Sequence, residues 1–345
     1  MFGLDLSSSG AKLVELGMDA SGGYVLERLA AESFEKGWIV DGQVEKFDEV
    51  VEAVRRLVAK SGTRTRNVVM GMPPSAVITK KITLPAGLGE EEMEIQVESE
   101  ANQYIPFSLD EVSLDFCVVG PSLVSAGDVE VLIAASRKDR VQDRQGLAEA
   151  AGLKPVIIDI ESHASRLAMA RLIAGLPNEG HDALVALFEI GADTTSLKVL
   201  RDEDMLYDRD QAFGGAQLTQ LIARQYSLPF EEAESRKITA DLPEDYAVEV
   251  LGPFIDSLSK EIGRSLQYFF TSMPHHKVHY VMLAGGTATL PGLTERVTAL
   301  TGFASMVVNP FEHMQLGSAV REARVRREAP AYLTACGLAM RRFLS

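Results

Sequence analysis

The sequence predicts an α/β fold with two related halves, and three observations support this prediction. Short apolar segments alternate with amphipathic helical segments along the whole chain, which is typical of mixed or parallel sheets covered by helices. A strand–turn–strand pattern occurs twice, which suggests an internal repeat with a ligand at the junction of its two copies. The 345 residues, 46% hydrophobic and 24% charged, suit about two globular domains.

The N-terminal segment, residues 1–74, is expected to be a strand–helix unit belonging to the first half. GLDL and AKLVEL have the pattern of strands. In EKFDEVVEAVRRLVAK, apolar residues recur every three or four positions, so they form one buried face of a helix.

Residues 75–155 are expected to form an inserted subdomain with strands and helices of its own. Its strands are AVITKKITL, VSLDFCVV and VEVLIAAS, and an acidic helix covers EEEMEIQVESEANQYI. A second helix runs to Gly152. The chain-turning pairs Pro73-Pro74 and Gly152 to Pro155 stand near its two ends and suit domain borders.

The remaining residues complete the first half and build the second. Residues 156–180 return to the first half through the strand PVIIDI and a helix that begins at Glu161. Residues 181–329 form the second half, in which strands ALVALFEI, TSLKVL and DMLYDRDQAF precede two helices and a further strand–helix–strand unit. Residues 330–345 are predicted to be a closing helix that packs back on the first half.

Charge and cysteine content exclude several classes of protein. The formal charge of −15 disfavours nucleic acid and anionic lipid as partners. The two cysteines are far apart and lack metal-ligand spacing, which fits a reducing cytoplasm. No apolar stretch approaches the ~20 residues that span a bilayer, so any membrane attachment is expected to be peripheral and without insertion.

The first strand–turn–strand pattern carries a candidate phosphate site. Small residues in the turn, Ser7, Ser8, Ser9 and Gly10, let backbone N–H groups and hydroxyls approach an anion. Asp5 before the turn can hold hydrated Mg²⁺, and Lys12 after it can meet phosphate charge. Alone, this motif is equally an ordinary polar turn.

The second copy repeats this chemistry. Its residues in order are Glu189, Gly191, Asp193, Thr194 and Thr195. Because two turns of the same composition follow two similar strands, the phosphate interpretation gains weight over a pair of unrelated polar turns.

Three further segments are candidates for holding a nucleoside. Gly285, Gly286 and Thr287 follow a strand, where the absence of Cβ atoms lets a purine or ribose lie flat, although a tight connection alone would also need glycines. Gly214-Gly215 precede a helix whose N–H groups can face an anion, or simply start that helix. Glu234 and Lys237 share one helical face, either as donor and acceptor for a nucleoside or as a salt bridge.

Other chemistries have weaker support. His275, His276 and His279 lie in a loop without a nearby carboxylate, so we assign them no metal. The P-loop, dinucleotide-binding, hydrolase-elbow and zinc-protease motifs are all absent from the sequence.

The order of these elements resembles the actin, Hsp70 and sugar-kinase superfamily. Within it, the whole chain is similar to the PilM family of type IV pilus assembly proteins, which are relatives of the division protein FtsA. The segments that carry the resemblance are GLDLSSSGAKLVEL, ESEANQYIPFSLDEVSLDF, VLIAASRKD, AGLKPVIIDIES, FEIGADTTSLKV, AESRK, LAGGTATLPGL, VVNPFE and PAYLTACGLAMR.

This resemblance implies an actin-like ATPase fold, with an FtsA-like inserted subdomain and a nucleotide cleft between the halves. It implies ATP and Mg²⁺ as cofactors, with the ion held through water by Asp5 and Glu189. Phosphate contacts then fall on both turns, and nucleoside contacts on the glycine segments and the Glu234–Lys237 pair. The family pattern usually has Asp at position 189, so we expect ATP binding with at most slow hydrolysis.

The resemblance also implies a partner. PilM-type proteins bind the cytoplasmic N-terminal segment of PilN, which places them at the inner membrane as part of the pilus assembly platform. In the inserted subdomain, Tyr104, Pro106 and Phe107 of NQYIPF offer rigid apolar surface for a peptide, or else cap a helix with core residues. An FtsA-like division protein and a small-molecule kinase or ATPase of the same superfamily are the alternatives.

Overall fold

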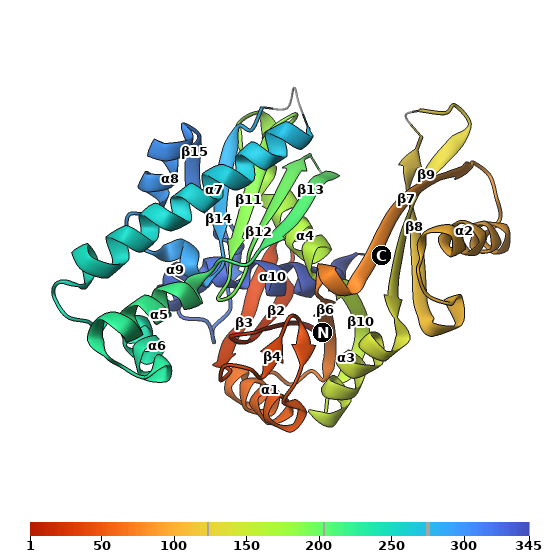
Figure 1. The fold of residues 1–345 in the computed structure, drawn as a ribbon. Helices are drawn as coiled ribbons and strands as arrows, with labels where there is room; N and C mark the ends of the chain where they lie inside the picture. The colour runs from red at the N-terminus through yellow and green to blue at the C-terminus, as the bar shows by residue number, and fades with distance from the viewer. Residues whose placement is uncertain (123, 203, 274–276, 345) are drawn as a thin grey trace.

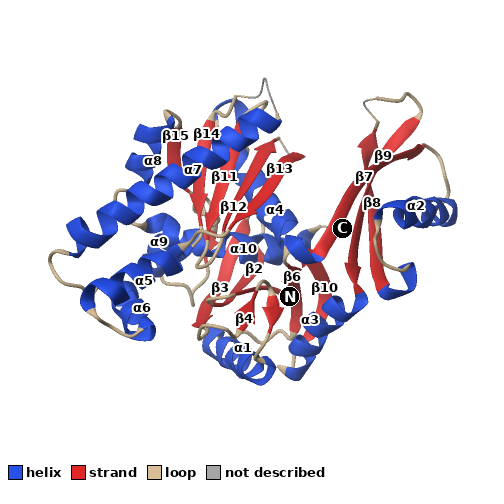
Figure 2. Ribbon diagram, in the orientation of Figure 1, coloured by secondary structure: helices blue, strands red, loops and turns tan. Residues whose placement is uncertain are grey.

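The computed structural model describes residues 1–122, 124–202, 204–273 and 277–344, and it contains two similar halves with a smaller lobe attached to the first (Figure 1). Each half is built around one sheet, and helices cover the sheets (Figure 2). Among the described residues, no helix has both the length and the apolar character needed to cross a bilayer.

The sheet of the first half has the order β10-β6-β1-β2-β3-β16. β1 pairs antiparallel with β2, and β2 with β3, whereas β6 and β10 run parallel to β1. The strands are β1 (Phe2–Ser7), β2 (Gly10–Met18), β3 (Tyr24–Ser33), β6 (Asn67–Met72), β10 (Lys154–Ile160) and β16 (Gln315–Leu316). β4 (Ile39–Val40) and β5 (Gln43–Val44) form a separate small hairpin.

The sheet of the second half repeats this topology in the order β13-β12-β11-β14-β15. Three antiparallel strands are again followed by two strands parallel to the first of them. The strands are β11 (Leu184–Ile190), β12 (Thr195–Arg201), β13 (Asp204–Gln211), β14 (Tyr280–Ala284) and β15 (Ala304–Val307). The internal repeat predicted from the two hairpins is therefore present in both sheets.

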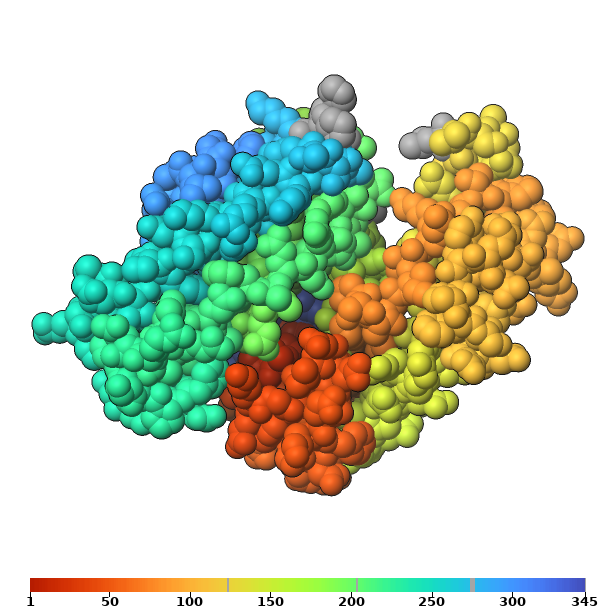
Figure 3. All heavy atoms as spheres, in the orientation of Figure 1, coloured from red at the N-terminus to blue at the C-terminus, as the bar shows by residue number. Residues whose placement is uncertain are grey.

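The lobe consists of a three-stranded antiparallel sheet and one covering helix. Its strands, in the order β7-β9-β8, are β7 (Val77–Pro85), β8 (Val112–Pro121) and β9 (Asp128–Arg137), and the helix is α2 (Glu90–Tyr104). Apolar residues of this helix and of the strands form a core separate from those of the two halves. Figure 3 shows the lobe standing off the second half, and Lys81 bridges the two through Asp204 at 3.6 Å.

Helices α1 (Phe47–Ser61), α5 (Gly215–Tyr226) and α7 (Gly252–Ser272) follow amphipathic patterns in their sequences. In α1 the buried side chains include Val50, Val54 and Leu57, and the helix ends at Gly62 in the left-handed conformation. The others are α3 (Lys138–Ala150), α4 (Glu161–Ile173), α6 (Phe230–Thr239), α8 (Leu293–Thr301), α9 (Glu322–Glu328) and α10 (Leu333–Met340).

Helices α4 and α10 join the two halves. They cross each other, and their apolar residues share one core with β2, β3, β11 and β14. Gly337 lies so close to α4 that a Cβ atom there would meet the carbonyl oxygen of Ala164 at 1.8 Å. The backbones of the two helices are therefore in direct contact at this crossing. The sheets of the two halves pack on either side of it.

The structure differs from the sequence-based expectation at two elements. β3 is a strand of the first sheet that the sequence analysis does not include. Charged residues interrupt the alternation of apolar and polar residues in YVLERLAAES. α3 was expected within the inserted unit, residues 75–155, but Leu147 and Ala148 pack into the core of the first half. The physical reason is that Leu147 and Ala148 of α3 are apolar and pack with α1 and the strands of the first half, while the helix also contacts β8 and β9 of the lobe.

Candidate functional site

The turn between β1 and β2 presents the first group of predicted residues. Asp5 lies directly opposite Lys12 in the hairpin, and its Oδ2 is 3.3 Å from the Lys12 Nζ. Ser7 Oγ donates a hydrogen bond to the Gly10 carbonyl at 3.0 Å, which tightens the turn around Ser8 and Ser9. A side chain at position 10 would collide with the backbone of β3, since its Cβ would lie 2.4 Å from Glu32 O.

The turn between β11 and β12 has the same construction. The Gly191 N–H donates to Thr194 O at 2.9 Å, and Asp193 and Thr194 are exposed at the tip. Thr195 is buried, and its hydroxyl donates to Phe213 O at 2.6 Å. This bond ties the turn to the segment that carries Gly214-Gly215.

Glu189 stands before this turn as Asp5 stands before the first. Its Oε2 accepts a hydrogen bond from Lys198 Nζ, and its Oε1 accepts one from Thr334 Oγ1 of α10 at 3.1 Å. Burial alone would lower the pKa of Lys198, but the neighbouring Glu189 carboxylate raises it, so this lysine stays charged. Both oxygens of Glu189 therefore have protein partners, one of them on the closing helix.

The glycine segments meet the second turn through close backbone contacts. A Cβ atom on Gly214 would lie 2.4 Å from Ala192 O, and one on Gly285, which has a φ of +90°, would lie 2.3 Å from Ile190 O. The Thr287 hydroxyl donates to Gly191 O at 3.2 Å. Close backbone packing therefore requires glycine at positions 214 and 285. A Cβ atom on the neighbouring Gly286 would meet nothing within 4 Å.

The predicted nucleoside pair is joined in one hydrogen-bonded group. Lys237 Nζ lies 2.6 Å from Glu234 Oε2 and donates to Thr219 Oγ1 at 2.7 Å. The Thr219 hydroxyl itself bonds the Glu234 carboxylate. α6 and α5 are thus held together on the second-half side, and Lys237 and Glu234 remain partly exposed.

A contact between the halves lies near this group. The Lys36 Nζ is 5.2 Å from the centroid of the Phe230 ring. Lys36 follows Phe34, whose N–H bonds Ser9 O of the first turn at 3.0 Å, and Phe230 begins the helix that carries Glu234 and Lys237. A cation–π contact therefore connects the two sides of the site.

Glu161 belongs to this candidate site, although the sequence analysis identified it only as the start of a helix. It opens α4 directly after β10, and its side chain lies over Gly71 of β6, where a Cβ would come within 2.6 Å of its Cγ. Burial and then the negative charge of Asp5 raise the pKa of Glu161 to about 8, with a smaller contribution from Glu189. The sheet order could have revealed it, because β10, β6 and β1 are parallel neighbours whose carboxyl ends meet at one edge.

These residues fit a hydrated magnesium ion with a nucleotide phosphate. Asp5, Glu161 and Glu189 repel one another electrostatically, and a divalent cation would relieve that repulsion. Within the described residues, no three His, Cys, Asp or Glu side chains are placed to hold a metal by themselves. Mg²⁺ usually keeps several waters and takes phosphate oxygens, so such a set is not needed.

Of the three histidines considered in the sequence, the structure describes His279, which pairs with the start of β11. The imidazole Nδ1 of His279 accepts a hydrogen bond from the Leu184 N–H at 2.9 Å. The backbone N–H of His279 donates to Leu184 O at 2.8 Å. These bonds extend the sheet beyond β11. His275 and His276 lie outside the described residues.

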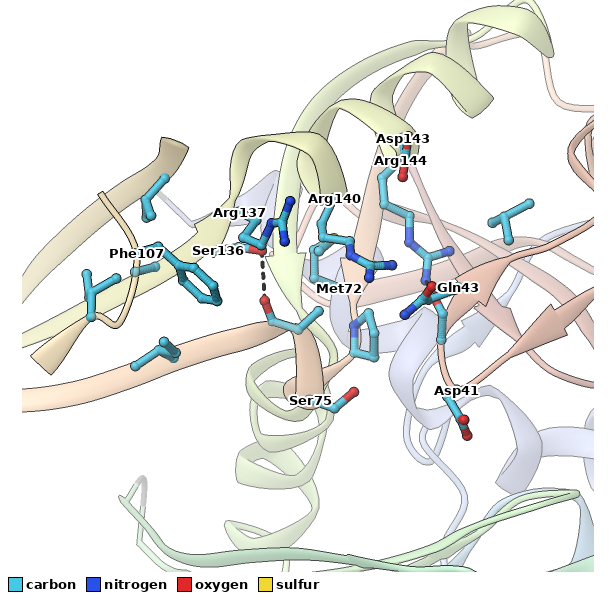
Figure 4. A pocket seen from close by; sticks show the side chains of 18 residues that line it. Asp41, Gln43, Met72, Ser75, Phe107, Ser136, Arg137, Arg140, Asp143 and Arg144 are labelled. Carbon is cyan, nitrogen blue, oxygen red and sulfur yellow. Dashed lines mark hydrogen bonds between the residues drawn. The ribbon is translucent and has the colours of Figure 1, made fainter. Parts of the chain in front are cut away.

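A cavity of about 500 Å³ lies between the first half and the lobe (Figure 4). One wall comes from the β4–β5 hairpin and the end of β6, and the other from the lobe and the start of α3. Its lining residues are Asp41, Gly42, Gln43, Val44, Met72, Pro73, Ser75, Ala76, Ile78, Ile105, Phe107, Val112, Ala135, Ser136, Arg137, Arg140, Asp143 and Arg144.

The predicted anchor residues lie at different places around this cavity. Phe107 lines it, is 39% exposed, and has the Arg137 guanidinium 5.6 Å from its ring centroid. Tyr104 is 47% exposed, lies outside the lining and has Lys80 4.8 Å from its ring centroid. Pro106 is exposed, whereas Ile105 between them is buried in the core of the lobe. Neither aromatic ring is a core residue.

Comparison with known proteins gives the family. The family model described as type IV pilus assembly protein PilM matches residues 3–343. A solved structure described as the PilM-PilN type IV pilus biogenesis complex is 30% identical over 99% of this chain and 97% of that chain, with a TM-score of 0.80.

The chain belongs to the PilM family.

More distant structures share the fold. The ethanolamine utilization protein EutJ from Carboxydothermus hydrogenoformans is 19% identical over 98% of this chain and 88% of that chain, with a TM-score of 0.57. An archaeal actin homologue in complex with ADP is 11% identical over 100% of both chains, with a TM-score of 0.50. PilM-family membership and the actin-like ATPase fold, both expected from the sequence, are confirmed.

Proposed function

We propose that this PilM-family protein is an ATP-binding scaffold of the type IV pilus assembly platform. The observation that carries the proposal is the duplicated turn: Ser7–Gly10 and Gly191–Thr194 end equivalent strands of two equivalent sheets, each preceded by a carboxylate. Such turns offer N–H groups and hydroxyls to phosphates from both sides. ATP in complex with Mg²⁺ is the ligand that this arrangement suits.

Each half has a distinct task in holding the nucleotide. The two turns contact the phosphates, and Asp5 orients the hydrated ion, with Glu161 and Glu189 facing the same space. Lys237 and Glu234 take the ribose, and the surface at Gly285 and Gly286 takes the base. The bound ion supplies positive charge against the phosphates and the carboxylates.

Calorimetric titration with ATP and Mg²⁺ tests this assignment. Binding only to the native state stabilises it by RT ln(1 + [L]/Kd), about 2.7 kcal/mol at a hundredfold excess over Kd. We therefore expect a saturable heat and a rise of the unfolding temperature that both disappear in EDTA. Protein that contains no co-purified nucleotide and binds none would contradict the proposal.

The partner segment is proposed to lie in the cavity between the first half and the lobe. The related solved structure is a complex with PilN. In this chain, the cavity combines apolar residues such as Ile78, Val112 and Phe107 with polar groups at one end, which suits an extended peptide. Docking there leaves the nucleotide turns free, so one protein can bind both ligands.

Membrane association then follows from the partner. The chain carries a charge of −15, which opposes anionic headgroups. We propose that it is cytoplasmic and reaches the inner membrane through the cytoplasmic N-terminal segment of PilN, and thereby joins other pilus assembly components.

Liposome sedimentation separates recruitment by a protein from recruitment by lipid. We expect sedimentation only with vesicles that contain embedded PilN. Phe107→Ala should lower the sedimented fraction while leaving the affinity for ATP unchanged, and Val119→Ala, a similarly exposed residue of β8 outside the cavity, should not. Strong binding to bare anionic vesicles would contradict the proposal.

A further inference from the structure

The polar end of the cavity is formed by two arginines of α3. Arg140 and Arg144 lie one helical turn apart, and Figure 4 shows both side chains reaching from α3 toward Gln43. Like charges four residues apart on a helix repel each other. The pair is therefore unfavourable for α3 itself, which suggests a role outside the helix.

Arg144 has an unused hydrogen-bond donor inside the protein. Only 3% of the residue is exposed. Its Nη2 donates to Gly42 O at 3.0 Å, but its Nη1 is buried without a hydrogen-bond partner. A buried charged donor without a partner destabilises the protein, so an acceptor that entered the cavity would relieve this penalty.

Arg140 lies beside it and is also available. It is partly exposed, and no hydrogen bond or ion pair connects its side chain to another of the described residues, although its backbone N–H donates to Asp139 Oδ1. Arg137, the third arginine of the lining, differs because it pairs with Asp139 at 2.5 Å. Arg140 and Arg144 together thus present guanidinium N–H groups to one end of the cavity.

The other charges around the cavity do not satisfy this pair. Asp41 and Asp143 also line it, but neither forms an ion pair with Arg140 or Arg144 in the part of the chain that the structure describes. Burial lowers the pKa of Arg144, while Glu161, Asp5 and Asp143 oppose this shift, so the guanidinium stays charged. Two guanidinium groups with N–H donors that no carboxylate accepts indicate an anionic ligand.

We propose that Arg140 and Arg144 bind a carboxylate of the docked peptide, so that the cavity selects a segment with an aspartate or glutamate beside its apolar residues. The inference rests on the proposed peptide docking and adds the chemical class of the group recognised. Guanidinium groups bind carboxylates through paired, charge-assisted hydrogen bonds, which give both orientation and specificity. The apolar end near Phe107 takes the neighbouring residues of the same segment.

Calorimetry with the full-length protein and a synthetic peptide of the PilN cytoplasmic N-terminal segment tests the proposal. The same peptide with each Asp and Glu replaced by Asn and Gln is expected to bind roughly 10- to 100-fold more weakly. Arg140→Gln should lower the affinity for the acidic peptide by a similar factor and remove the preference over the amide peptide. Because Arg144→Gln changes a buried residue, Arg140→Gln is the primary variant, and the unfolding midpoint of each is measured first.

Arg326→Gln, an exposed residue of α9 that does not line the cavity, is the matched control and should leave both affinities unchanged. Equal affinity of the acidic and amide peptides for the parent protein would overturn the carboxylate assignment while leaving peptide docking intact. Displacement of the acidic peptide by an equal concentration of inorganic phosphate would also overturn it, because the site would then bind any oxyanion. No binding of either peptide would instead contradict the proposed docking itself.

Discussion

Single carboxylates determine the electrostatics of the candidate nucleotide site. Asp5, Glu161 and Glu189 come from three different strands or strand ends, and Glu161 faces the negative charge of the other two. Lys12 and Lys198 neutralise two of them through direct contacts. Glu161 is the residue whose pKa is raised to about 8, so in the empty protein its carboxyl group holds a proton at neutral pH.

This proton makes the stability of the empty protein depend on pH. Between the ordinary glutamate pKa of about 4.5 and a folded pKa of about 8, the folded state holds a proton that the unfolded state has released. The free energy of unfolding should therefore fall as pH rises through this range, by at most about 1.4 kcal/mol per pH unit. Urea unfolding in EDTA from pH 5 to 8 measures this slope, and Glu161→Gln should flatten it. An equal slope in that variant would assign the dependence to other groups.

Asp5 and Lys12 should matter for the nucleotide more than for the fold. In the proposed site, removing Asp5 takes away a charge that would face the hydrated ion, and removing Lys12 takes away one that would face phosphate. We expect Asp5→Ala and Lys12→Ala each to weaken ATP–Mg²⁺ binding about tenfold or more, as expected for loss of a charge-assisted contact. Calorimetry measures the affinity, and Glu52→Ala on the exposed face of α1 is the control. Unchanged affinity in both variants would place the phosphates elsewhere.

Most of the candidate-site residues could be named from the sequence because they stand in short local patterns. The two turns, the glycine pairs and the Glu234–Lys237 pair each lie within a few residues of chain. Glu161 and Arg144 could not be predicted this way, because their role depends on the order of strands in the sheet and on the packing of α3 against the first half. Buried charge is a property of tertiary structure, and no local pattern carries it.

At the scale of elements, the crossing of α4 and α10 sets how the halves meet. The Ser165 and Thr334 hydroxyls lie 3.1 Å apart at this crossing, and Thr334 also bonds Glu189 of the second half. The composition of PAYLTACGLAMRRF predicted a helix. It did not predict that Gly337 would be the contact point, because that depends on the path of another helix.

Gly337→Ala should destabilise the protein through this contact. The added methyl group would meet Ala164 O at 1.8 Å, so the two helix backbones would have to separate. Overpacking of this kind costs about 1–3 kcal/mol or more. Gly146→Ala on α3 is the matched control, because its Cβ would meet nothing within 4 Å, and alanine in a helix is favoured by about 0.5–1 kcal/mol. Denaturant unfolding measures the free energy of unfolding of both variants. An unchanged value for Gly337→Ala would contradict the expected destabilisation.

For the whole molecule, we expect binding of ATP to be much more evident than its turnover. Glu189 is held by Lys198 and Thr334, and Glu161 holds a proton at neutral pH in the empty protein, so neither is a ready base for an attacking water. Phosphate release by the purified protein should be slow or undetectable over hours. Steady multiple turnover without any partner, or phosphoryl transfer to a metabolite, would favour the enzyme alternative.

The contact between Lys36 and Phe230 is expected to affect the residence time of a bound nucleotide. It joins the first half to the helix that carries Glu234 and Lys237, so a movement that separates the two halves at this point would break it. An exposed cation–π contact contributes about 0.5–1 kcal/mol, which corresponds to a two- to fivefold change in a rate. Lys36→Met should therefore shorten the residence time of a fluorescent ATP analogue by this factor in stopped-flow chase experiments, with its association rate nearly unchanged. A single weak contact between the two halves would thus change the time for which a nucleotide remains bound by about two- to fivefold.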